Sequence, residues 1–173
     1  MKKYKTIEEF KQAPKYPVIL VLDNIRSLNN VGSFFRTADS FLLEAIYLCG
    51  ITGKPPHREI EKTALGATLS VDWKYFNTTS HALHQLKNHG YKIAAIEQSE
   101  NSIPLQHWQI GEQNKWALIF GNEINGLSKE SLQQADIVLE IPQFGTKHSL
   151  NVAVCAGIVC WEFLRKIKPF SSK

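Results

Sequence analysis

Three short segments combine residue types that could carry chemistry, and each follows an apolar run of the kind that forms a buried strand. In the first, Asn30 suits the N-cap of the helix that follows, and this structural role alone would explain it. Gly32 costs roughly 1 kcal/mol inside a helix, so we expect another backbone or a substrate to approach it closely. Arg36 could stabilise a developing negative charge, but the residues alone favour a surface pair with Asp39.

The second segment follows the apolar run 116–120 and contains Gly121, Glu123 and Gly126. A glycine at a strand end lets a flat ligand lie against the backbone. The segment has neither a glycine-rich phosphate loop nor a Walker lysine, which disfavours nicotinamide and nucleoside triphosphate ligands. On the residues alone, Glu123 could equally be a solvated turn residue.

The third segment runs from Ile141 through a short loop to a long apolar helix expected over 150–167. Ser149 suits the N-cap of that helix. Asn151 would then lie in its first turn, where a buried amide needs hydrogen-bond partners.

Strands and helices alternate along the chain, which predicts an α/β domain with a mainly parallel sheet flanked by helices. Ligands of such sheets bind beyond the carboxyl ends of strands, and the three segments follow strand ends. We expect a single domain over 1–173 with a core of about 17–167 and loose tails at 1–14 and 168–173. The expected strands are 17–23, 45–49, 91–96, 116–120 and 137–141, with a weaker one at 71–76, and the helices are 30–42, 80–89, 128–135 and 150–167.

The composition indicates a globular protein with a net charge of +4, which permits binding to a polyanion but does not prove it. No apolar run is long enough to span a bilayer and none forms a signal peptide, so we expect a cytoplasmic location. Cys49, Cys155 and Cys160 are expected to be buried thiols rather than disulfides. The scattered histidines predict no metal site.

Taken together, the three segments closely resemble the motifs of the SpoU (TrmH) family of SPOUT methyltransferases. The resemblance covers residues 17–167, and order and spacing match as well as residue types. The matching residues are Asn30, Gly32 and Arg36, then Phe120, Gly121, Glu123, Gly126 and Leu127, and finally Ile141, Pro142 and Ser149 to Ala153.

The resemblance implies a trefoil knot in the C-terminal part of the chain, with S-adenosylmethionine bound in the knot mainly by backbone groups. General folding rules would not predict a knot. The matching cofactor positions are Gly121, Ile141 and Leu150, and the stretch Ile96 to Ser99 is similar to a further cofactor-side loop.

The implied reaction is transfer of a methyl group to a ribose 2′-hydroxyl of RNA, without a metal. The residue that matches Arg36 is essential in the family and has been proposed as the base. Because arginine keeps its proton in proteins, we expect Arg36 to stabilise the developing alkoxide or hold a phosphate, and to accept the proton only in that setting. Asn30 and Glu123 would orient Arg36 or the RNA, whereas Ser149 and Asn151 would shape the site where ribose and cofactor meet.

Three alternatives compete with this interpretation. A non-catalytic RNA-binding module would keep the fold but lose site residues, and every motif residue is present. SPOUT enzymes that act on a base nitrogen carry different motifs. A generic α/β interaction domain would leave Arg36, Glu123 and Asn151 unexplained.

We also expect a homodimer and a tRNA substrate, a guanosine of the D-loop, with ribosomal RNA as the alternative. The helix over 150–167 is apolar nearly all round, with small Ala156 and Gly157, and the family resemblance implies sites completed across a dimer interface. The tRNA prediction rests on the lack of an RNA-binding module before residue 17. It also rests on similarity to eukaryotic tRNA ribose-methylating domains at Ala95 to Ser99, Ser149 to Val152 and Trp161-Glu162. Phosphate contacts would come from Arg26, Lys54, Arg58 and Lys147.

Overall fold

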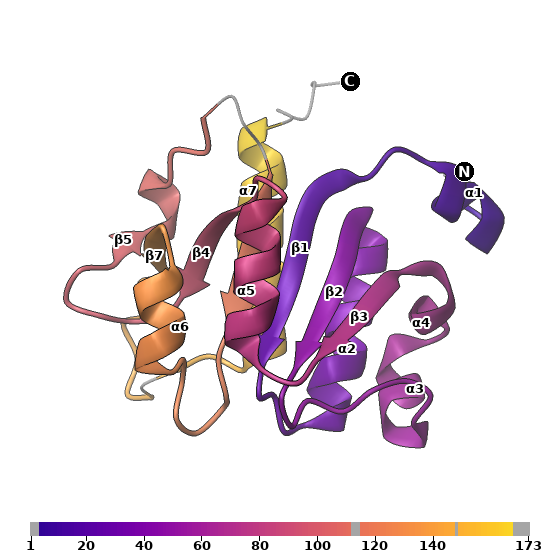
Figure 1. Cartoon of the computed structure of the whole chain (residues 1–173), viewed down its shortest axis with the longest axis horizontal. Helices are drawn as coiled ribbons and strands as arrows, with labels where there is room; N and C mark the ends of the chain where they lie inside the picture. The colour runs from indigo at the N-terminus through magenta and orange to yellow at the C-terminus, as the bar shows by residue number, and fades with distance from the viewer. Residues whose placement is uncertain (1–3, 112–114, 148, 168–173) are drawn as a thin grey trace.

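The computed structural model describes residues 4–111, 115–147 and 149–167, and the strands in these ranges form one parallel sheet (Figure 1). The order across the sheet is β3-β2-β1-β6-β4-β7-β5, and all neighbouring strands run parallel. Late in the chain, β6 therefore inserts between β1 and β4. The strands are β1 (Tyr16–Asp23), β2 (Leu43–Cys49), β3 (Asp72–Phe76), β4 (Lys92–Ile96), β5 (Ile103–Pro104), β6 (Trp116–Phe120) and β7 (Ile137–Glu140).

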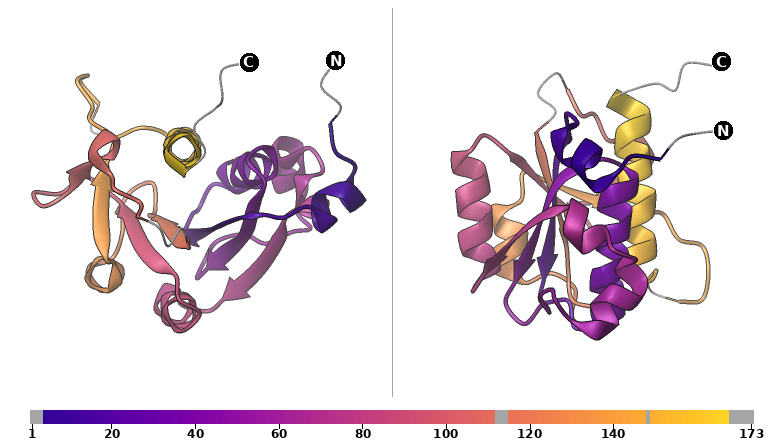
Figure 2. Two further views of the ribbon diagram at one scale, coloured as in Figure 1. Left: turned by 90° about the horizontal axis from the view of Figure 1, so that it is seen from above. Right: turned by 90° about the vertical axis from the view of Figure 1, so that its right-hand side faces the viewer.

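Helices cover both faces of the sheet, giving three layers (Figure 2). Alternate side chains of the central strands point to opposite faces, so that Leu20 packs in one apolar cluster and Val21 in the other. The α/β class and the parallel sheet flanked by helices are therefore confirmed. One face carries α2 (Leu28–Ser40), α3 (Arg58–Ala64), α4 (Ala67–Ser70) and α7 (Val152–Ile167), and the other carries α5 (Thr79–Asn88) and α6 (Lys129–Gln134).

Two expected features of the N-terminal half were wrong. The tail 1–14 was expected to be loose, but α1 (Ile7–Gln12) forms there, with a capping box between Thr6 and Glu9 and with Phe10 buried. The next helix, α2, begins at Leu28 rather than at residue 30, and its N-cap is Ser27, whose hydroxyl accepts from the Asn30 backbone N–H. Sequence periodicity also missed the short helices α3 and α4. Residues 168–173 lie outside the described ranges.

The carboxyl ends of the central strands lie at the same edge of the sheet. Phe120 of β6 pairs with Leu22 of β1 on one side and with Ile96 of β4 on the other, and Ile96 also pairs with Leu139 of β7. Residues that immediately follow these strands are therefore neighbours in space although they are far apart in the chain.

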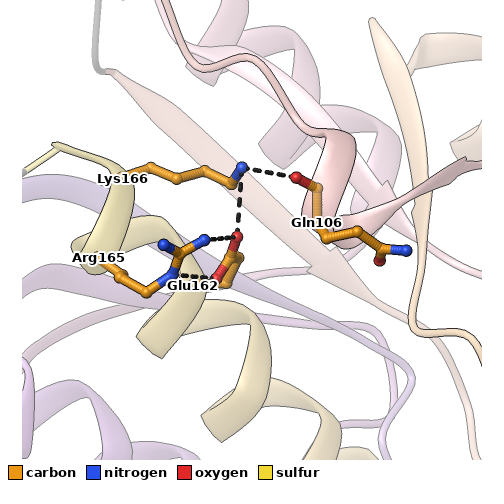
Figure 3. Close-up of polar contacts among 4 residues, drawn as sticks. All are labelled: Gln106, Glu162, Arg165 and Lys166. Atoms are coloured by element: carbon orange, nitrogen blue, oxygen red, sulfur yellow. Dashed lines mark hydrogen bonds and ion pairs between the residues drawn. The ribbon is translucent and has the colours of Figure 1, made fainter.

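The C-terminal end of α7 is fixed by a small charged cluster (Figure 3). The Glu162 carboxylate accepts from Arg165 Nε at 2.8 Å and Nη2 at 2.7 Å, and Lys166 Nζ lies 3.2 Å from it. Lys166 also donates to the Gln106 carbonyl of the 3-10 helix η1 (Leu105–His107) at 2.9 Å. The Arg165 hydrogen bonds hold the pKa of Glu162 below its usual value. This cluster connects the end of α7 to the β5 side of the sheet.

Two of the three thiols are buried as expected, Cys49 and Cys160, whereas Cys155 is only half-buried. Burial raises the pKa of Cys49 and of Cys155 to about 12, and for Cys155 the nearby Glu97 carboxylate adds to the effect. None of the helices in the described ranges is both long enough and apolar enough to cross a membrane.

Candidate active site

A cavity of about 610 Å³ lies beyond the carboxyl ends of β4, β6 and β7, against the start of α7. Its volume is ordinary for a small-molecule site. The residues predicted to bind a cofactor all line it, as do Ser149 and Asn151. The cofactor positions are Ile96, Gly121, Ile141 and Leu150.

The charged residues of this cavity are acidic. Among the described residues that line it, three are glutamates, Glu97, Glu123 and Glu140, and none is a lysine, arginine or histidine. Such a cavity favours a ligand that carries positive charge and disfavours a phosphate. Across the described ranges, no three His, Cys, Asp or Glu side chains are grouped so that they could hold a metal ion.

The loop after β6 forms a tight turn that closes on itself. The backbone N–H of Asn122 donates to the carbonyl of Gly126 at 3.1 Å, and the Gly126 N–H donates back at 2.8 Å. A Cβ on Gly121 would lie 2.4 Å from the Gly126 carbonyl carbon, so only glycine fits there without moving the backbone. The glycine is therefore required by the turn itself, which forms one wall of the cavity.

Glu123 projects from this turn towards the loop after β1. Its carboxylate accepts from the backbone N–H groups of Arg26 at 3.1 Å and Ser27 at 3.2 Å, and from Asn30 Nδ2 at 3.1 Å. Partial burial alone would raise the pKa of Glu123, but its own backbone N–H and the three hydrogen bonds just described together lower it below its usual value. Glu123 is therefore a connection between two loops, and it is also an exposed residue of the turn, so the solvated turn position that the sequence left open is confirmed together with a bridging role.

Asn30 extends this connection to the third segment. Because its Nδ2 donates to the Glu123 carboxylate, its Oδ1 is free to accept, and Asn151 Nδ2 donates to it at 3.2 Å. Asn151 Oδ1 in turn accepts from the backbone N–H groups of Ala153 at 3.0 Å and Val154 at 3.2 Å. Asn151 is thus the cap at the start of α7, and the expectations that Ser149 caps this helix and that Asn151 is buried within its first turn were both wrong.

A buried carboxylate that the sequence did not single out lies beneath the site. Asp23, at the end of β1, is 3% exposed, and its Oδ1 accepts from Thr79 Oγ1 at 2.6 Å and from Asn24 Nδ2 at 2.7 Å. Its Oδ2 accepts from Ser131 Oγ at 3.1 Å, and Asn122 Nδ2 donates to the Asn24 carbonyl at 2.7 Å. Asp23 therefore holds the starts of α5 and α6 and, through Asn24, the turn that carries Glu123. In the sequence, a polar residue at the end of an otherwise apolar run was the feature that could have identified Asp23.

Arg36 is the one predicted catalytic residue that lies apart from this arrangement. It is exposed on α2 and lines a separate hollow with Phe41, Lys62 and Gly157 of α7. The expected pair with Asp39 is not formed, because the Asp39 carboxylate accepts from Ser70 Oγ instead. Within one chain, the structure brings together Asn30, Glu123 and Asn151, with Ser149 lining the same cavity, but not Arg36.

Gly32 is explained by packing rather than by a substrate. A Cβ at this position would lie 2.1 Å from Thr63 Oγ1 and 2.2 Å from the Ile60 carbonyl, because α3 crosses α2 closely here. Of the two expected reasons for a helical glycine, the approach of another backbone is the one found.

A parallel α/β sheet with a small-molecule cavity at its carboxyl edge defines the class of protein, and comparisons with known proteins define the family. The model of the SpoU rRNA Methylase family matches residues 17–161. The chain belongs to this family.

Named relatives and solved structures agree with this assignment. The chain is 31% identical over 150 residues to the 23S rRNA (guanosine-2′-O-)-methyltransferase RlmB of Neisseria meningitidis, an alignment that covers 87% of this chain and 59% of the relative. It is 30% identical to the tRNA (guanosine(18)-2′-O)-methyltransferase of Borreliella burgdorferi, covering 87% of this chain and 67% of that protein. An AdoMet-bound rRNA methyltransferase structure from Sinorhizobium meliloti matches with a TM-score of 0.82 at 25% identity, covering 96% and 62% of the two chains. The chain thus spans about three fifths to two thirds of the lengths of these proteins.

Proposed function

We propose that this chain binds S-adenosylmethionine in the acidic cavity and transfers its methyl group to a ribose 2′-hydroxyl of RNA. The observation that carries the proposal is the hydrogen-bonded set of Glu123, Asn30 and Asn151, one residue from each of the three motifs, at the edge of that cavity. The two relatives are named as RNA guanosine 2′-O-methyltransferases, and the Sinorhizobium structure is described as AdoMet-bound, which supports both the reaction and the cofactor.

The residues of the cavity fit this cofactor. S-adenosylmethionine carries a sulfonium and an ammonium group but only one carboxylate, and the cavity presents glutamates and no described basic residue. Ile96, Ile141 and Leu150 offer apolar surface for the adenine, and the tight turn that Gly121 makes possible forms the wall beside them. When bound, the cofactor supplies an activated methyl group on a good leaving group.

The chain's own task is to position and activate the ribose hydroxyl. Holding the oxygen in line with the methyl group can contribute several kcal/mol to the rate enhancement. Asn30 and Glu123 set the shape of the loop before α2, and Ser149 and Asn151 form the wall beside α7. Arg36 would stabilise the alkoxide as the proton leaves, or hold an adjacent phosphate.

A homodimer completes the proposal, because Arg36 lies outside the cavity of its own chain. The α7 face beside the Arg36 hollow is apolar, with Val154 53% exposed, Ile158 39% and Trp161 49%. A Cβ on Gly157 would meet nothing within 4 Å, so a partner could approach α7 closely there, whereas Ala156 is buried within the chain. Pairing through this face would bring Arg36 of one subunit towards the cavity of the other.

We extend the proposal to a trefoil knot between β6 and α7. It is supported by the insertion of β6 between β1 and β4. It is also supported by the path of the chain from β7, near the β5 edge of the sheet, to α7, which packs on α2. The single domain over 1–173 and the cytoplasmic location stay predictions.

The proposed substrate is tRNA, at a guanosine of the D-loop, with ribosomal RNA as the alternative. The Borreliella relative is named for guanosine 18 of tRNA, whereas the Neisseria relative is named for 23S rRNA. Exposed Arg26, Lys54, Arg58 and Lys147 would bind phosphates, so that binding weakens steeply with salt.

The test is to offer radiolabelled S-adenosylmethionine with unmodified tRNA transcripts and ribosomal RNA in parallel. Alkali-resistant dinucleotides would identify 2′-O-methylation, and mapping would place it in the tRNA D-loop. Methylation of ribosomal RNA alone would overturn the tRNA assignment and leave the chemistry standing. Transfer to a substrate with 2′-deoxyribose at the mapped position would overturn the ribose assignment.

A further inference from the structure

Glu97 lies at the centre of the cavity's strand edge. It is the first residue after β4, as Gly121 is the first after β6, and the last residues of these neighbouring strands, Ile96 and Phe120, pair with each other. Glu97 and Gly121 are thus side by side where the cofactor is proposed to bind. In dinucleotide-binding folds, an acidic residue near the phosphate-binding glycine turn binds ribose hydroxyls.

The Glu97 carboxylate is held by two backbone groups. Oε1 accepts from the N–H of Gln98 at 3.1 Å, and Oε2 accepts from the N–H of Leu127 at 3.0 Å. Gly126 has φ +64°, and a Cβ there would lie 2.4 Å from Oε2, so a side chain at 126 would displace the carboxylate. The turn after β6 and the carboxylate are therefore built to fit each other.

The remaining hydrogen-bonding capacity of Glu97 matches a pair of hydroxyls. An ionised carboxylate has about four acceptor sites, and the two backbone groups take one on each oxygen, which leaves one on each. Glu123 differs, because its two oxygens already accept three hydrogen bonds from the loop before α2. Among the cavity's glutamates, Glu97 is therefore the one that is both fixed and able to accept two further O–H donors.

We propose that Glu97 binds the vicinal 2′- and 3′-hydroxyls of the cofactor's ribose and so selects a ribonucleoside cofactor; this inference rests on the proposed function. The cofactor's positive groups would be attracted to any of the three glutamates, so their charge does not favour Glu97 over Glu123 or Glu140. A pair of neighbouring hydroxyls does favour Glu97, because it is the fixed carboxylate with an acceptor site left on each oxygen.

The experiment is calorimetric titration with two ligands, S-adenosylhomocysteine and its 2′,3′-dideoxy analogue, and three proteins. For the wild type we expect the dideoxy analogue to bind about 10- to 100-fold more weakly, as hydrogen bonds to a charged group predict. Glu97→Gln keeps an oxygen for the Leu127 N–H, and we expect the affinities of this variant for the two ligands to differ by about 3-fold or less. Glu140→Gln is the matched control, since Glu140 also lines the cavity, and it should keep the discrimination of the wild type.

The outcomes separate this inference from the proposed function. Wild-type protein that binds neither ligand would overturn both. Wild-type protein that binds both ligands equally would overturn only the role of Glu97. The role also fails if Glu97→Gln weakens both ligands by the same factor, because Glu97 would then act only through Leu127.

Discussion

Replacing Asp23 should destabilise the fold more than replacing any other aspartate at a strand end, because its carboxylate accepts from two buried hydroxyls, those of Thr79 and Ser131. In Asp23→Ala both hydroxyls lose their acceptor, at about 1–3 kcal/mol each, so the free energy of unfolding should fall by about 2–6 kcal/mol. Asp23→Asn keeps one oxygen, and the hydroxyls can rotate to accept from the new amide, so a loss of about 1–2 kcal/mol is expected.

Urea unfolding followed by tryptophan fluorescence measures these losses. The control is Asp72→Ala, at the exposed start of β3, which should change the free energy of unfolding by no more than about 0.5 kcal/mol. An Asp23→Ala loss below about 1 kcal/mol, or one no larger than that of the control, would show that the hydroxyls find other partners and that Asp23 does not hold α5 and α6. Unchanged m-values are needed for the comparison.

Four further predictions concern the site. Arg36→Ala should abolish methyl transfer while S-adenosylmethionine affinity in calorimetry stays nearly unchanged, because Arg36 does not line the cavity; a large loss of affinity would contradict its placement. Gly121→Ala should weaken S-adenosylhomocysteine binding about 10-fold or more, since its Cβ meets backbone at 2.4 Å, whereas Gly145→Ala, whose Cβ meets nothing within 4 Å, should not. If the site is shared between subunits, a mixture of the Arg36→Ala and Gly121→Ala proteins should be more active than either variant alone. Glu123 has a lowered pKa, so its contribution to stability is complete above the usual value of 4.5 and is lost as the pH falls through the lowered value. The difference in unfolding free energy between wild type and Glu123→Gln should therefore be constant above about pH 5 and shrink below it; a difference that grows on acidification would refute this.

The convergence of the three segments could be predicted from sequence because it follows from a simple geometric rule. Continuous apolar runs indicated strands buried on both faces, such strands run parallel, and the carboxyl ends of parallel neighbours share an edge. The rule brings Glu123, Asn30 and Asn151 together without any knowledge of side-chain contacts.

The details within a segment follow no such rule. Ser149 and Asn151 are both good capping residues, so residue type alone did not decide between them, and the helix begins only after Asn151. Arg36 is six residues beyond Asn30 on α2, which at 1.5 Å per residue places it about 9 Å further along the helix axis. Membership of one motif therefore did not place Arg36 in the same cavity, and the short helices around residues 58–70 gave too few turns for a periodic pattern.

The hydrogen bonds of Glu123 also limit which residue can take the proton of the ribose hydroxyl. A carboxylate that accepts from two backbone N–H groups and from Asn30, and whose pKa is thereby lowered, is a weaker base than a free carboxylate. Its charge instead fixes the orientation of the Asn30 amide. The Asn30 amide oxygen then accepts a hydrogen bond from Asn151, which lies at the start of α7. Glu123 therefore organises the three loops. In the proposed reaction, the negative charge that develops on the ribose oxygen would be stabilised by a cation outside this hydrogen-bonded set. Arg36 of a neighbouring subunit can fill that role.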